Sequence, residues 1–172
     1  MPVPRVAVVV VAALFFLPTA AHPQQLDLTA AEASKIVEGC ATHAKAKGQS
    51  HAIAVYDAGG NAIATLRMDG NGSGIMAFAM QKAEATARWG FSTANMEAAT
   101  RETPGLAAAP GVVTVPGGVP VFSADGQRFL GAVGVSGEAP KEDAACAEAG
   151  IAAAGLSSSR KARPEAVPPD NR

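Results

Sequence analysis

The segment from Val115 to Gly137 constrains the fold of this chain more than any other stretch. Residues 119–122 and 129–135 have the composition of two strands, and the pair Asp125-Gly126 supplies the positive φ that a tight hairpin turn needs. Side chains of the second strand alternate between two faces, and neither face carries a charge. The sequence therefore predicts a central strand that is covered on both sides.

Two glycines of this second strand, Gly131 and Gly134, predict that another part of the chain packs very close to its backbone. A capping box, Thr29 to Glu32, begins the first helix of the chain. Helices are expected over residues 29–47, 75–89, 92–100 and 140–154, and further strands over residues 51–57, 62–68 and 112–115. This order predicts an α+β domain with a single antiparallel sheet of about five strands flanked by helices.

Both ends of the chain differ from this central domain. Residues 1–21 have the layout of a secretory signal peptide, with Arg5, an apolar run and small residues before a cleavage site. A retained membrane anchor is the alternative, but the run is shorter than the ~20 residues that a spanning helix needs. We therefore expect a periplasmic or extracellular protein. Residues 157–172 contain three prolines and mixed charges and are expected to be a disordered tail, which leaves residues 26–156 as one domain.

Composition excludes some classes of function. The formal net charge of the whole chain is −1, and no basic patch with interleaved aromatic residues is present, so nucleic-acid binding is not supported. The two cysteines, Cys40 and Cys146, permit one disulfide in an oxidising compartment, but two buried free thiols are an equally open alternative. A C-x-x-C-H motif is absent, which argues against covalent haem attachment.

No motif assembles a catalytic site. The sequence lacks a G-x-S-x-G elbow, an H-E-x-x-H helix and a P-loop. The glycine-rich loop at residues 70–74 has no P-loop lysine and is interpreted as a connection between hairpin and helix. Glu142 and Asp143 lie where a helix N-terminus favours acidic residues, and metal binding is a distant alternative for them. We predict that the protein is not an enzyme.

Several motifs occur in an order that is specific only when they are taken together. They are A-V-Y-D-A-G-G-N at residues 54–61, R-M-D-G at 67–70, K-A-E-A-T-A at 82–87, P-G-G-V-P at 116–120 and G-A-V-G-V-S-G at 131–137. Over roughly residues 28–156 the chain resembles the GlcG/HbpS family, to which the C-terminal domain of PduO-type proteins also belongs. Residues 103–111 look trimmed, because the family often carries a longer segment there.

The resemblance implies the same α+β architecture, non-covalent haem binding and assembly into homo-oligomers. In some members it also implies a role in haem or iron sensing, although no sensor partner can be named for this chain. A core of small residues beside alanine-rich helices independently favours self-association, because copies of the chain would bury those faces. We therefore expect a homo-oligomer.

Haem b needs an apolar slot, one or two axial ligands and cations near its propionates. His43, at the border of the inward stripe of the first helix, is the best candidate for an axial ligand and metal contact, and His51 is the second. Arg67 and Lys82 are candidates for the cations, although Lys82 is more simply read as the partner of a protein carboxylate. We expect haem b in a shallow site along the first helix.

Two other functions stay open at this stage. The chain could be a binding module for a small metabolite or a corrinoid-related molecule, because relatives are encoded with glycolate or cobalamin functions. It could also be a structural oligomer without a cofactor. A Soret band on purification favours haem, whereas a colourless protein stabilised by small organic acids or a corrinoid favours the second function.

Overall fold

The computed structural model describes residues 28–162, so the predicted signal peptide and most of the predicted tail lie outside the described residues. The elements are α1 (Ala30–Ala46), β1 (Ala52–Asp57), β2 (Ala62–Arg67), α2 (Ser73–Trp89), α3 (Thr93–Glu102), the 3₁₀ helix η1 (Pro104–Ala108), β3 (Gly118–Phe122), β4 (Phe129–Ser136) and α4 (Pro140–Ala153). Among residues 28–162, no helix is long and apolar enough to span a membrane.

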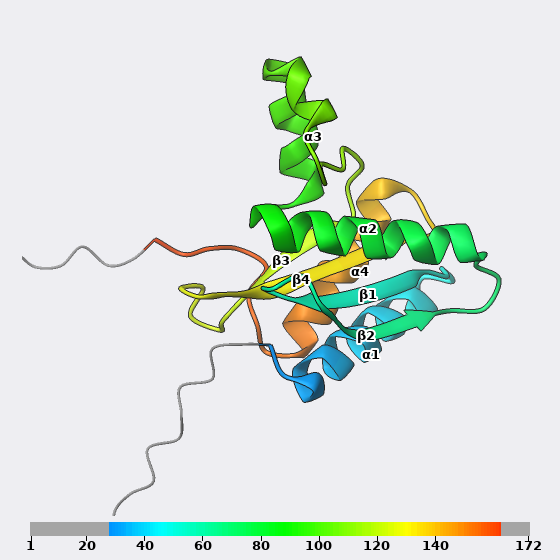
Figure 1. Cartoon of the computed structure of the whole chain (residues 1–172). Coiled ribbons are helices and arrows are strands. Elements are labelled where there is room, and N and C mark those ends of the chain that lie inside the picture. Colours follow the sequence, from blue (N-terminus) through cyan, green and yellow to red (C-terminus); the bar gives the residue numbers. More distant parts are fainter. Residues whose placement is uncertain (1–27, 163–172) are drawn as a thin grey trace, which may run out of the picture.

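The strands form one antiparallel sheet in the order β2-β1-β4-β3. Helices α1 and α4 pack on one face, and α2 crosses the other, so the domain has three layers (Figure 1). Residues 130–136 of the central strand β4 are all buried. The predicted α+β class, the single antiparallel sheet and the double cover of this strand are therefore confirmed.

The sheet has four strands, so the prediction of about five is wrong. Residues 112–115 have no strand partner, and the two valines at 112 and 113 lie beside α2. The outer edge of β3 has little pairing capacity left, because the Gly118 amide donates to Thr93 Oγ1 and Pro120 has no amide hydrogen. At the end of the strand, the Phe122 backbone pairs with Ser157.

The two glycines of β4 lie where backbones approach one another closely, as predicted. A Cβ added to Gly134 would lie 2.0 Å from the Ala79 carbonyl oxygen and 2.4 Å from the Ala83 amide nitrogen, both in α2. A Cβ added to Gly131 would lie 2.1 Å from the Tyr56 carbonyl oxygen of β1. Gly134 therefore sets how closely α2 can pack on the sheet, and Gly131 how closely β1 and β4 can pair.

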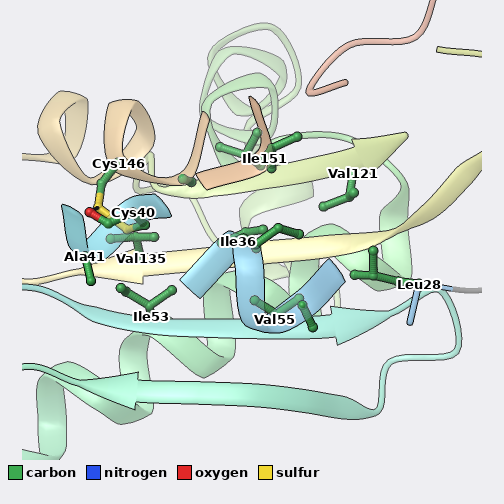
Figure 2. Close-up of a cluster of buried hydrophobic side chains, with 14 of the residues drawn as sticks. Leu28, Ile36, Cys40, Ala41, Ile53, Val55, Val121, Val135, Cys146 and Ile151 are labelled. Carbon is green, nitrogen blue, oxygen red and sulfur yellow. Dashed lines mark hydrogen bonds between the residues drawn. A yellow bond between two sulfur atoms is a disulfide. The ribbon is translucent and has the colours of Figure 1, made fainter. Parts of the chain in front are cut away.

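The larger hydrophobic core lies between the sheet and the pair α1 and α4. Ile36 of α1, Ile53 and Val55 of β1, and Ile151 of α4 are completely buried in it (Figure 2). At one end of this core, the Cys40–Cys146 disulfide joins α1 to α4 (Figure 2). Of the two alternatives that the sequence left open for the cysteines, the structure has the disulfide.

Two segments extend the domain beyond its three layers. Helix α3 begins with a Ser92 cap and stands away from the body of the domain, together with η1 (Figure 1). Beyond α4, Ser157 pairs with Phe122, and the Lys161 amide donates to the Gly126 carbonyl. Residues 157–162, the start of the predicted tail, therefore lie against β3 and the turn that follows it.

Candidate functional site

A buried cluster of polar side chains forms at one end of the sheet, and we call its members, Lys82, Asp143 and His51, the polar centre. Lys82 Nζ lies 2.9 Å from Asp143 Oδ2 and donates to the Val135 carbonyl oxygen at 2.9 Å. His51 Nδ1 lies 3.1 Å from Asp143 Oδ1. Two of the four predicted site residues therefore meet on one carboxylate.

The polar centre connects all three layers of the domain. Lys82 comes from the inner face of α2, His51 immediately precedes β1, and Asp143 lies in the first turn of α4. The Glu138 amide donates to Asp143 Oδ1 at 3.1 Å, which ties the turn after β4 to the same carboxylate. These contacts hold α2 and α4 in register across the end of the sheet.

The polar centre is closed to solvent. Lys82 is 1 % exposed, Asp143 2 % and His51 0 %. Burial lowers the pKa of Lys82 from its ordinary value, and the hydrogen bond and charge of Asp143 oppose that shift. A Cβ added to Gly117 would lie 2.7 Å from Lys82 Nζ, so the backbone itself covers the ammonium group. Lys82 therefore pairs with a carboxylate of the protein, which is the simpler of the two interpretations that the sequence allowed.

His51, the second candidate for an axial ligand, lies inside the domain and not at a surface where haem could bind. Its ring is fully buried, and its Nε2 has no hydrogen-bond partner among residues 28–162. Asp143 is the residue that the sequence analysis missed as a site residue, because its place in the first half of a helix already explained an acidic side chain. Its only sequence signal was an acidic pair, Glu142-Asp143, of which one member faces inward.

Arg67 lies in a different place, a groove of about 430 Å³ between α1 and the end of β2 that we call the α1–β2 groove. Leu66 and Met68 give the groove an apolar wall, and Leu66 is among the exposed large hydrophobic residues of the domain. Lys45 and Arg67 bring two positive charges to its lining, with Asp69 as the acidic residue. The guanidinium of Arg67 donates to the Asn71 carbonyl oxygen.

His43 is half-buried on α1 and does not line the α1–β2 groove. The groove is lined from α1 by Ala41 and Lys45, and a residue two positions from each lies on roughly the opposite side of a helix. His43 is instead close enough to Glu142 for its charge to help lower the pKa of that carboxyl, after the larger effects of Lys47 and Gln49. The structure thus unites His51 and Lys82 and leaves His43 and Arg67 apart.

These features define an α+β domain with a closed polar centre and an open groove, and within residues 28–162 no group of three or more His, Cys, Asp or Glu side chains could hold a metal ion. A family described as haem degrading protein HbpS-like matches residues 28–152. The chain belongs to this family. Its resemblance to HbpS, inferred above from sequence motifs, is therefore confirmed.

Solved structures show the same fold. A double mutant of HbpS from Streptomyces reticuli is 28 % identical, with a TM-score of 0.68, over 87 % of this chain and 97 % of that one. The protein ORFY from Klebsiella pneumoniae is 24 % identical, with a TM-score of 0.69, over 77 % and 94 % of the two chains. PduOC in complex with haem is 20 % identical, with a TM-score of 0.69, over 78 % and 99 %. No curated protein matches the sequence.

Proposed function

We propose that this chain is an exported protein that binds haem b non-covalently and takes part in haem or iron handling or sensing. The observation that carries the proposal is the family match, which spans 28–152 and so covers nearly all of the described domain. Among proteins of this fold, PduOC forms a complex with haem. Binding without turnover is part of the proposal, although the family is described as haem degrading.

The α1–β2 groove offers the chemistry that haem requires. Leu66 and Met68 supply apolar contact area, and Lys45 and Arg67 supply positive charge for two propionates. The polar centre, in contrast, has no surface for a ligand to contact. We place haem along α1, with His43 or the thioether of Met68 as axial ligand, because imidazole and thioether both bind haem iron. Which of the two binds decides on which side of α1 the haem lies.

Replacement of His43 by Ala is expected to shift the Soret maximum and to weaken haem binding. Loss of an axial bond that contributes ~2 kcal/mol would raise the dissociation constant roughly thirtyfold. Met68→Leu keeps the size of the side chain and removes the sulfur, so it should have this effect instead if the α1–β2 groove holds the haem. Arg67→Gln should weaken binding without a Soret shift. Titration of the purified apoprotein with haemin, followed by absorbance, measures all of these effects.

Met76→Leu is the matched control for Met68. Met76 packs against a second, smaller cluster of buried residues between α2 and the sheet, made of Ala54, Tyr56, Ala83, Ala87 and Ala132. If neither His43→Ala nor Met68→Leu changes the spectrum, neither side chain is the axial ligand. Absence of a Soret band in the wild-type protein after haem addition and desalting would refute haem binding. Progressive loss of the band with a reductant such as ascorbate would refute binding without turnover.

Export and self-association form part of the same proposal. The signal-peptide layout of residues 1–21 supports export, and the alanine-rich helices and exposed Leu66, Met80 and Phe91 support burial of these faces between copies. The exported protein should begin near His22 by intact mass, and light scattering at tens of micromolar should show more than a monomer. Exported material that still carries residues 1–21 would contradict the cleaved signal peptide. A strictly monomeric protein would contradict self-association.

A further inference from the structure

A second cavity, of about 340 Å³, lies away from the α1–β2 groove, between the start of α3, strand β3, helix α4 and residues 158–160. Its volume is near the lower end of the range of about 300–1,000 Å³ that small-molecule pockets occupy. None of the five residues proposed for haem contact, His43, Lys45, Leu66, Arg67 and Met68, lines this cavity. A ligand in this cavity would therefore contact none of the residues proposed for haem.

The lining of this cavity from the sheet side is apolar. Val119, Pro120 and Phe122 of β3 contribute to it, and Phe91, 41 % exposed, contributes from the turn before α3. The edge of β3 cannot extend into a ladder with a bound peptide, because Pro120 lacks an amide hydrogen and the Phe122 backbone is already paired with Ser157. The cavity thus favours a small apolar molecule over an added strand.

Two opposite charges line the same cavity without pairing. Arg160 and Glu148 both contribute to its lining, and no ion pair joins them to each other or to any other described residue. The Arg160 guanidinium carbon lies 5.3 Å from the centre of the Phe122 ring, which places the cation over the apolar side of the cavity. An unpaired cation and an unpaired anion beside an apolar lining complement a small molecule that carries both charges.

We propose that this cavity binds an α-amino acid with an apolar side chain. Arg160 binds its carboxylate, Glu148 binds its ammonium group, and the side chain packs on Val119, Pro120 and Phe91. A carboxylate and an ammonium group separated by one carbon can each meet a charge that the protein leaves unpaired, through charge-assisted hydrogen bonds. A ligand with only one of the two charges leaves either Arg160 or Glu148 without a partner.

Calorimetric titration of the full chain with L-phenylalanine tests this proposal, with two analogues as probes. 3-Phenylpropanoate lacks the ammonium group and 2-phenylethylamine lacks the carboxylate. We expect one saturable site for L-phenylalanine and at least about tenfold weaker binding of each analogue, because each loses one charge-assisted contact.

Charge-removing variants assign the two contacts. Glu148→Gln should weaken L-phenylalanine about tenfold and, because it removes a repelling charge, should strengthen 3-phenylpropanoate. Arg160→Gln should do the converse, weakening L-phenylalanine and strengthening 2-phenylethylamine. Both residues are exposed, so neither change should disturb folding. Glu102→Gln and Arg101→Gln, on the exposed end of α3 and outside the cavity, are the matched controls.

Three results would overturn the proposal. The first is the absence of saturable binding by L-phenylalanine. The second is equal affinity for the amino acid and both analogues, which would show that the two charges of the ligand do not contribute to binding. The third is L-phenylalanine binding that neither Glu148→Gln nor Arg160→Gln changes, because the amino acid would then bind elsewhere. A failure of haem binding leaves each of these outcomes unaffected.

Discussion

Replacement of Asp143 by Asn is expected to lower the free energy of unfolding by about 3–5 kcal/mol, the range for breaking a buried ion pair from one side. The variant leaves the Lys82 ammonium group, which is 1 % exposed, without a carboxylate partner, and the Val135 carbonyl oxygen is its other hydrogen-bond acceptor among residues 28–162. It also removes the carboxylate that faces His51. Chemical denaturation followed by circular dichroism measures the loss.

The loss of stability should depend on pH in a definite direction. Burial already lowers the pKa of Lys82 in the folded protein, and Asp143 opposes that shift. Without Asp143 the folded-state pKa falls further below the unfolded value, so the unfolded chain binds more protons and stability rises with pH. The difference in unfolding free energy between wild type and Asp143→Asn should therefore become smaller as the pH is raised toward the ordinary pKa of lysine, 10.5.

Two further variants test whether the loss of stability comes from the unpaired buried charge. The double variant Lys82→Met and Asp143→Leu removes both charges together and should recover most of the loss. Glu84→Gln breaks the exposed Glu84–Arg88 pair and should cost no more than about 1 kcal/mol. If Asp143→Asn is no more destabilising than Glu84→Gln, the polar centre does not hold the layers together.

Loss of the Cys40–Cys146 disulfide is expected to have the second large effect, a fall in unfolding free energy of about 2–5 kcal/mol. The bond closes a long loop, because its cysteines are 106 residues apart in the sequence. In the chain-entropy view, such a cross-link restricts the unfolded chain more than a short one would. The double variant Cys40→Ala and Cys146→Ala, compared with wild type by denaturation, measures the effect.

Reduction of the disulfide distinguishes the stability that the covalent bond contributes from the stability that the packed sulfur atoms contribute. Both cysteines are completely buried, so alanine substitution also removes packed atoms. Wild type that has been reduced in denaturant and refolded with reductant keeps those atoms, and it should lose most of the same stability. Reductant should leave the double variant unchanged. Wild type that yields two free thiols on unfolding without reductant would show that the bond is absent.

The sequence by itself determined the local structure and the layers. The capping box at Thr29, the turn at Asp125-Gly126 and the uncharged strand from Phe129 act over a few residues, and all appear where they were predicted. Gly134 also predicted correctly that another backbone lies close to β4, here that of α2. A glycine inside a buried strand commonly occurs where another backbone approaches closely. Family membership followed from the order of such local motifs.

Only the tertiary structure decided which distant side chains meet. Asp143 lies 61 residues from Lys82 and 92 from His51, and no local pattern shows which face of α4 an acidic residue takes. The pairing of Cys40 with Cys146 likewise depends on how α1 and α4 lie against each other. Residues 112–115 have strand-like composition, but a strand also needs a partner with free backbone groups. The edge of β3 does not offer them, because its Gly118 amide is bonded to Thr93, Pro120 has no amide hydrogen, and Phe122 is paired with Ser157.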